Sequence, residues 1–286
     1  MRRAMMNAIE IRGLKKSFKD FTLGPFDLDL PEGSIMGLVG ENGAGKSTTI
    51  GLIMNALRSD EGTVKVLGID NKGPSFRAVK EDIGIVLDEA YYPEPLTARK
   101  LGFIMKHTYA AWDEGLYEGY VKDLDLPMNK AFKDFSRGMK MKLAIAIAMS
   151  HKARLLILDE ATSGLDPIVR DEILDVFNEF TRDEKHSILL SSHIVSDLEK
   201  VCDYIAFIHK GRLLFCEEKD RLLEDYGIIK VSSSVYDSLD PACIKGVKKS
   251  PYGVEALVTK SSLPGGIDVE HTSLEDVILF LAKGVN

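Results

Sequence analysis

Several features that would assign a sequence to a class at once are scarce in these 286 residues. Its three cysteines, Cys202, Cys216 and Cys243, cannot all pair and lack metal-ligand spacing, which excludes a disulfide scaffold and a cysteine metal site. The longest apolar runs, such as 143–149 and 155–158, are far shorter than the roughly 20 residues that span a bilayer. We therefore expect a cytoplasmic protein with reduced thiols and no membrane-spanning segment.

An excess of basic residues is also missing. The chain has 37 Lys and Arg against 44 Asp and Glu, a formal net charge of −7. Nucleic-acid-binding proteins usually have a basic excess or stripe, so no nucleic-acid partner is expected. The length allows one large α/β domain or a domain of about 200 residues with an appendage.

The most informative stretch is 40–48, which reads GENGAGKST. It follows an apolar run at 35–39 and precedes apolar residues at helical spacing over 49–54, so we expect a strand, a glycine loop and a helix. The spacing matches a phosphate-binding loop, in which Lys46 reaches the β- and γ-phosphates and Ser47 ligates Mg²⁺. A chance glycine-rich turn is the alternative, which the flanking pattern disfavours. The predicted nucleotide-binding residues here are Asn42, Gly43, Ala44, Gly45, Lys46, Ser47 and Thr48.

Two acidic strand ends follow the loop. The run 83–87 ends at Asp88, which either faces the phosphates and their metal or is a solvated strand end. The run 154–158 ends in Asp159 and Glu160, 113 residues after Lys46. On a strand expected beside the phosphate loop, Asp159 could hold Mg²⁺ through water and Glu160 could polarise an attacking water. His193 ends a further strand at 187–193, at the ligand edge of the sheet, although a lone histidine is usually structural.

The rest of the chain divides by pattern. Residues 9–18 and 21–30 alternate as short antiparallel strands, with Phe18 at a strand end, where it either stacks on a base or joins the core. From 90 to 150 the pattern is helical and aromatic, with a strong helix over 139–150, and 168–182 predicts another helix. Beyond 217 we expect a small α+β appendage with a charged helix, short strands at 228–231 and 254–258, and a last helix capped by Ser273 and Asp276.

With these pieces in order, residues 9–217 resemble the ATP-binding subunit of ABC transporters. The matching motifs are GENGAGKST for Walker A, LLILDE (155–160) for Walker B, FSRGMK (135–140) for the signature, SGLD (163–166) for the D-loop and SSH (191–193) for the switch histidine. Phe18 falls where the family has its adenine-stacking aromatic. The resemblance implies an α/β P-loop NTPase domain over 1–216, with an antiparallel β subdomain and a helical signature subdomain at about 90–150, followed by an accessory region over 217–286.

Two departures from the family pattern stand out. The signature has Arg137 in place of its first glycine and Met139 in place of glutamine, and Asp88 stands where the family usually has the Q-loop glutamine. Similar changes occur in the bacterial ABC-2 exporter branch, in which ATPase and membrane chains are separate. Asp88 is therefore a candidate catalytic and metal-binding residue in place of that glutamine.

The resemblance implies a mechanism. Two copies would sandwich two ATP molecules with Mg²⁺, each ATP held by the phosphate loop of one copy and by Ser136 and Gly138 of the other. Glu160 would be the base, His193 would contact the γ-phosphate and Asp166 would link the two sites. A membrane-spanning permease on another chain would dock near 90–112 and hold the protein at the inner face of the membrane, although many aromatics there are expected to be core.

Export driven by ATP hydrolysis is thus the first hypothesis. The alternatives are a soluble ABC ATPase acting on the ribosome or DNA, and a nucleotide-dependent sensor with little turnover. A single uninterrupted cassette and the acidic charge disfavour the former. The intact set of Lys46, Asp159, Glu160 and His193 disfavours the latter.

Overall fold

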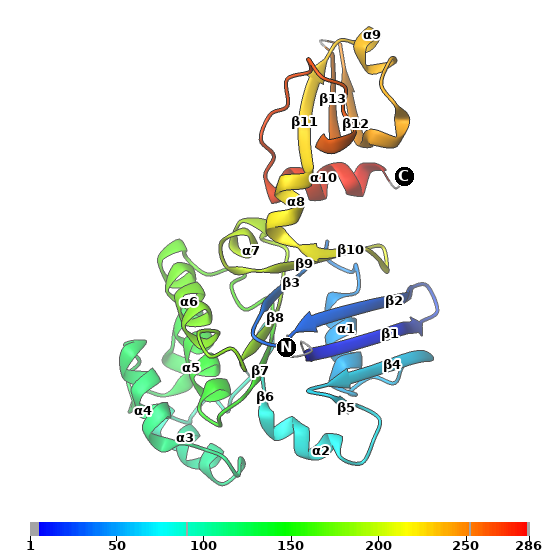
Figure 1. The fold of residues 1–286 in the computed structure, drawn as a ribbon. Helices are drawn as coiled ribbons and strands as arrows, with labels where there is room; N and C mark the ends of the chain where they lie inside the picture. Colours follow the sequence, from blue (N-terminus) through cyan, green and yellow to red (C-terminus); the bar gives the residue numbers. More distant parts are fainter. Residues whose placement is uncertain (1–5, 90, 252, 285–286) are drawn as a thin grey trace. The chain divides into compact units, whose positions relative to one another are not determined.

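The computed structural model describes residues 6–89, 91–251 and 253–284. The chain forms two compact units, Met1–Cys216 and Glu217–Asn286, and each is described by itself (Figure 1). Residue 90, at which the predicted helical segment begins, lies outside the described residues. Among the described residues, no helix has both the length and the apolar character needed to cross a membrane.

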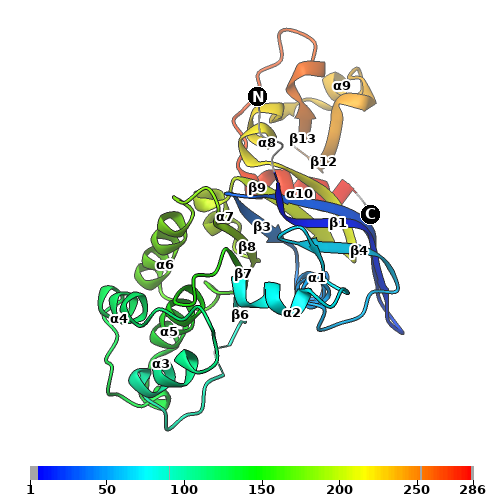
Figure 2. The same ribbon diagram turned by 60° about the horizontal axis from the view of Figure 1, so that its bottom comes forward.

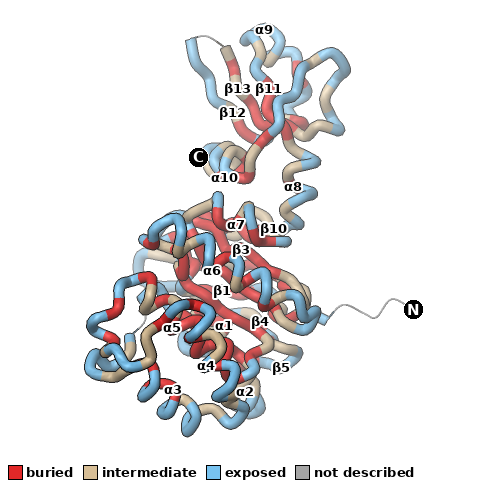
Figure 3. Tube along the Cα trace, turned by 90° about the vertical axis from the view of Figure 1, so that its left-hand side faces the viewer, coloured by how far each residue is buried: buried red, intermediate tan, exposed pale blue. Residues whose placement is uncertain are grey.

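The first unit is built on a six-stranded sheet in the order β10-β9-β3-β8-β7-β6. Neighbours from β9 to β6 run parallel, so their carboxyl ends meet at one edge, where ligands bind in such sheets. The strands β3, β7 and β9 are nearly continuous apolar runs, and β8 has an apolar centre flanked by serines; all four are buried almost throughout. The buried colour of β3 can be followed in Figure 3. The bounds are β3 Ile35–Val39, β6 Ile83–Val86, β7 Leu155–Asp159, β8 Ser187–Ser192, β9 Tyr204–His209 and β10 Arg212–Glu218.

The strand order corrects one expectation. The strand that carries Asp159 is not the direct neighbour of β3, because β8 lies between β3 and β7. Strand β8 follows β3 and β7 in the sequence but lies between them in the sheet. The order of the strands along the chain does not predict such an insertion. Asp159 nevertheless ends at the same sheet edge as the phosphate loop, because all three strands run parallel.

A second, antiparallel sheet has the order β2-β1-β4-β5, which confirms the antiparallel strands expected near the N-terminus. The bounds are β1 Asn7–Ser17, β2 Thr22–Pro31, β4 Glu61–Val66 and β5 Ile69–Asp70. Its inner residues share one hydrophobic cluster with β3, with α1 (Lys46–Ile53) and with residues of β7, β8 and β9. The glycine loop is therefore supported from both sheets.

Helices α3 (Ala98–Lys106), α4 (Glu114–Asp123) and α5 (Arg137–Met149) gather on the side of the central sheet away from the antiparallel sheet (Figures 1 and 2). They share a separate cluster that includes Tyr92, Trp112, Tyr117 and Tyr120. Tyr117 is thus core, and Tyr92, Trp112 and Tyr120 are partly buried against it, in line with the alternative to docking. The other helical segments of this unit are α2 Phe76–Val79, η1 Lys80–Asp82, η2 Phe132–Asp134, α6 Pro167–Phe180 and α7 Val195–Val201.

The second unit has a three-stranded antiparallel sheet in the order β11-β13-β12. Its last helix, α10 (Leu274–Gly284), begins with the predicted capping box, because the Ser273 Oγ accepts from the Asp276 N at 3.1 Å and the Asp276 Oδ2 accepts from the Ser273 N at 3.2 Å. The remaining elements are α8 Lys219–Asp225, β11 Tyr226–Val231, α9 Ser233–Tyr236, η3 Pro241–Cys243, β12 Ile244–Ser250, β13 Gly253–Thr259 and η4 Lys260–Ser262.

Candidate functional site

The glycine loop connects β3 to α1 and has the backbone that its sequence requires. Gly43 and Gly45 have φ values of 81° and 119°, a region that residues with a Cβ rarely adopt. A Cβ at Gly45 would lie 2.7 Å from the Leu23 Cδ1 of the antiparallel sheet. The loop therefore needs glycine both for its turn and for its close approach to β2.

Lys46, the first residue of α1, is 6% exposed and its ammonium lies within the loop. Its Nζ donates to the Gly40 carbonyl at 2.7 Å and to the Glu41 carbonyl at 3.4 Å. The same Nζ lies 3.1 Å from the Glu160 Oε1. The loop thus holds a buried cation at the start of a helix, an arrangement suited to binding an anion such as phosphate.

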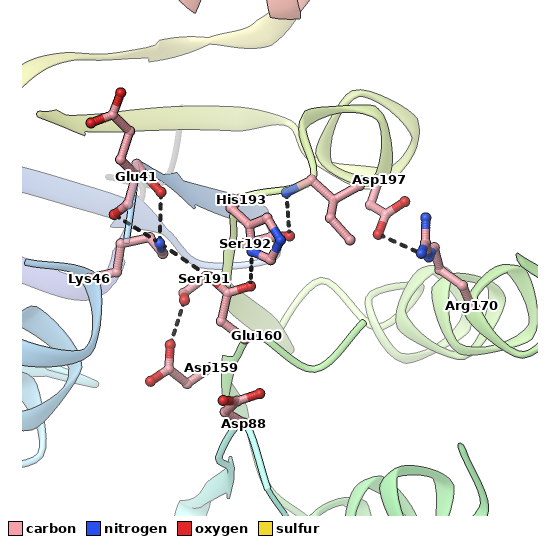
Figure 4. Close-up of polar contacts among 12 residues, drawn as sticks. Glu41, Lys46, Asp88, Asp159, Glu160, Arg170, Ser191, Ser192, His193 and Asp197 are labelled. Carbon is pink, nitrogen blue, oxygen red and sulfur yellow. Dashed lines mark hydrogen bonds and ion pairs between the residues drawn. The ribbon is translucent and has the colours of Figure 1, made fainter. Parts of the chain in front are cut away.

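Glu160 joins Lys46 to the switch histidine (Figure 4). Its Oε2 lies 2.7 Å from the His193 Nδ1, and its side chain is only 13% exposed. In this hydrogen bond the Glu160 carboxylate can accept from the His193 Nδ1. Glu160 also has φ of 53°, a strained backbone of the kind that occurs at functional sites.

Asp159, 7% exposed, is fixed by a neighbouring strand. The Ser191 hydroxyl on β8 donates to the Asp159 Oδ1 at 2.5 Å (Figure 4). Sequence reasoning matched Ser191 only to the SSH motif and assigned it no role. The signal in the sequence is that Ser191 lies two residues before His193 on a predicted strand. The pairing of β8 with β7, which brings Ser191 to Asp159, is seen in the structure.

Lys46, Asp159 and Glu160 line a cavity of about 390 Å³. The cavity brings together eight of the predicted residues with Asp88, whose side chain is 59% exposed. Phe21 and Glu41 also line it and were not predicted. The lining residues are Phe21, Glu41, Asn42, Gly43, Gly45, Lys46, Ser47, Thr48, Asp88, Asp159 and Glu160.

Six predicted residues do not line this cavity: Phe18, Ala44, Ser136, Gly138, Asp166 and His193. Phe18 is 44% exposed and its ring centre lies 6.3 Å from that of Phe21, so it is not core, and its stacking on a base stays a prediction. Ser136 caps α5 by accepting from the Met139 N at 3.2 Å, and Asp166 caps α6 by accepting from the Val169 N at 3.1 Å. Within one chain, the signature turn and the D-loop thus lie outside the loop cavity.

A buried ion pair supports the D-loop. Asp197 on α7 is 2% exposed, and its Oδ2 lies 3.7 Å from the Arg170 Nε on α6 (Figure 4). The Arg170 Nη2 also donates to the Leu165 carbonyl at 3.2 Å. Arg170 therefore connects the turn before Asp166 to the helix that follows His193.

Sequence and structure comparisons agree on the family. Residues 23–163 match the ABC transporter family. The chain is 32% identical to the bacitracin transport ATP-binding protein BcrA of Enterococcus faecalis, over 73% of this chain and 69% of the relative. It is also 32% identical to the lantibiotic transport ATP-binding protein SrtF of Streptococcus pyogenes, over 74% of this chain and 91% of the relative.

Solved structures give the same result. An ATP-binding subunit of an ABC transporter superposes with a TM-score of 0.66 at 27% identity, covering 75% of this chain and 91% of that one. A dimeric ATP-binding cassette bound to ADP and phosphate, 20% identical and covering 73% of this chain and 98% of that one, shares the fold with a TM-score of 0.65. These relatives disfavour the ribosome or DNA alternative.

The P-loop fold with its antiparallel sheet and helices confirms the fold class predicted from the motifs. The cavity adds a buried lysine and two carboxylates at the carboxyl ends of parallel strands. Together with the relatives, these features establish that the chain belongs to the ABC transporter family and is a nucleotide-binding ATPase subunit that powers an ABC exporter.

Proposed function

We propose that this subunit hydrolyses Mg-ATP in the loop cavity with Glu160 as general base, as one half of a homodimer that works on a separate membrane permease. The observation that carries the proposal is the contact of one carboxylate with both Lys46 and His193, at 3.1 Å and 2.7 Å. Lys46 would bind the β- and γ-phosphates, and Glu160 would take a proton from the attacking water. His193, oriented by Glu160, would contact the γ-phosphate.

Oxygen donors suited to Mg²⁺ lie in the same cavity. Ser47 contributes a hydroxyl and Asp159 a buried carboxylate with one oxygen already bound by Ser191, and Mg²⁺ prefers a few such ligands beside substrate phosphates. When bound, the ion would offset the charge of the β- and γ-phosphates. Asp88, at the rim, is a further candidate ligand.

We predict that Ser191→Ala weakens Mg²⁺-dependent ATP binding by about 10-fold, because loss of a partner that orients a metal ligand typically has this effect. The measurement is a Mg²⁺ titration of ATP binding. Ser192→Ala is the matched control, since the neighbouring Ser192 hydroxyl accepts from the Ile194 N at 3.0 Å and does not contact Asp159. Equal effects of the two variants would contradict the role given to Ser191.

The signature turn supports the homodimer. Ser136 and Gly138 lie at the start of α5, outside the loop cavity of their own chain. The first amides of a helix favour an anion, so a second copy placed head to tail could present them to the γ-phosphate. Asp166 would then lie near the dimer interface, and Phe18 would stack on the adenine.

An apolar groove beside the site supports a permease partner. A cavity of about 460 Å³ shares Ser47, Asp88 and Asp159 with the loop cavity. The rest of its lining includes the apolar residues Met54, Ile85, Leu87 and Tyr91, and Tyr91 is 80% exposed. A hydrogen bond to Glu89 raises the Tyr91 pKa, so the ring stays neutral. A helix of a membrane protein could dock here, which would hold the subunit at the inner face of the membrane. The relatives favour a peptide antibiotic as the exported compound.

The homodimer is tested by light scattering of the Glu160→Gln variant with Mg-ATP. We expect the mass to rise from 31.7 kDa to twice that value, because ATP remains bound between the copies when it is not hydrolysed. ADP should leave the variant monomeric, since the bonds to the γ-phosphate are absent. A monomer at saturating Mg-ATP would rule out the homodimer.

A further inference from the structure

Arg137 occupies the position of a signature glycine, and its guanidinium bridges two loops of its own chain. The Arg137 Nη2 lies 3.5 Å from the Asp88 Oδ1, after β6. A Cβ built on Gly164, in the D-loop, would lie 2.9 Å from the Arg137 Nη1 and 3.0 Å from its Cζ. The two departures from the family pattern thus contact each other.

This ion pair is exchangeable. The side chains of Arg137 and Asp88 are 52% and 59% exposed, and exposed pairs of this kind add little to stability. A phosphate group binds a guanidinium more strongly than an exposed carboxylate does, because it carries more charge and has more acceptor oxygens. A phosphate group brought close to Arg137 would therefore displace Asp88.

In the proposed homodimer, Asp88 and Arg137 of one chain lie at different nucleotide sites. Asp88 lines the loop cavity of its own chain. Arg137 lies between Ser136 and Gly138, which the proposed function directs to the ATP held by the second copy. The pair therefore joins a residue of one nucleotide site to a residue of the other.

We propose that Arg137 binds the phosphates of the ATP held by the partner copy, and that Asp88 restrains Arg137 within its own chain until that ATP is present. The inference rests on the proposed homodimer. Closure then exchanges the Asp88 contact for a phosphate contact. Asp88 would in this way oppose closure.

The test measures the dimer dissociation constant with Mg-ATP, in the Glu160→Gln background. We expect Asp88→Asn to tighten the dimer by about 1.5- to 5-fold, because it removes the competing partner of Arg137 while keeping an oxygen ligand. Arg137→Gln should weaken the dimer by about 10-fold or more, since bonds to a charged phosphate are lost. In the Arg137→Gln background, Asp88→Asn should have no further effect.

The opposite signs separate this inference from a structural role. If the Arg137–Asp88 pair only stabilises the chain, both Asp88→Asn and Arg137→Gln weaken the dimer, and that result overturns the inference. The inference is also overturned if Asp88→Asn still changes the dimer dissociation constant in the Arg137→Gln background. The exposed Arg182–Glu179 pair, 2.7 Å apart, is the matched control, and neither Arg182→Gln nor Glu179→Gln should change the dimer. If the Glu160→Gln parent forms no dimer, the proposed homodimer fails and the inference fails with it.

Discussion

Glu160→Gln is expected to lower the steady-state rate of ATP hydrolysis by about 100- to 10,000-fold, the range that a positioned general base contributes. The amide keeps the size of the carboxylate but cannot accept a proton from water. Its oxygen can still accept a bond from the His193 Nδ1, which lies 2.7 Å from the Glu160 Oε2. ATP binding should therefore survive while turnover is lost. Phosphate release measures the rate, and equilibrium binding of a fluorescent ATP analogue measures the affinity.

A matched acid in the same cavity gives the control for this prediction. Glu41 lines the cavity and its side chain is exposed, while only its backbone carbonyl contacts Lys46. Glu41→Gln should change turnover by less than about 3-fold, because this carboxylate makes no contact with Lys46 or His193. If Glu160→Gln retained a tenth of the wild-type rate, another group would be the base.

The second large effect concerns stability. We expect Arg170→Met to lower the free energy of unfolding of the first unit by about 3 kcal/mol, because it leaves the carboxylate of Asp197 buried without its counter-charge. For a unit of this size the melting temperature should fall by roughly 6–12 °C. Urea and thermal unfolding, followed by circular dichroism, measure both quantities.

A double variant distinguishes the loss of stability due to the unpaired charge from the loss due to changed packing. Replacing the whole pair, Arg170→Met with Asp197→Leu, removes the unpaired charge and should recover most of the stability, since apolar residues of similar volume often replace a buried ion pair at little cost. If Arg170→Met alone costs less than about 1 kcal/mol, the carboxylate is compensated in another way. The lost bond to the Leu165 carbonyl would also be expected to loosen the turn before Asp166.

The phosphate loop could be predicted because the residues that form it are consecutive in the sequence. The strand, the loop glycines and Lys46 follow one another in the sequence, and the positive φ values at Gly43 and Gly45 are those that only glycine adopts easily. The acids Asp159 and Glu160 were identified for a similar reason, since a buried apolar strand directly precedes them. Both line the cavity, and their roles there stay predictions.

Contacts between distant segments could not be predicted. The bond between Ser191 and Asp159 depends on β8 lying beside β7, and the pairing of Arg170 with Asp197 depends on how α6 packs against α7. Strand β12 (Ile244–Ser250) was missed because its sequence, IKGVKKS, is rich in lysine and has little apolar alternation, as befits an edge strand. The contact of Arg137 with Asp88 joins positions 49 residues apart.

The unit 217–286 has hydrophobic clusters built from Ile229, Ala256 and Val258 and from Ile228, Leu257 and Val277, and every member of these clusters belongs to this unit. Alternate residues of β13 supply both clusters, as expected where the two faces of a sheet are covered. The hydrophobic packing of this unit therefore comes from its own residues, so a substitution that empties one of these clusters should lower the stability of this unit first.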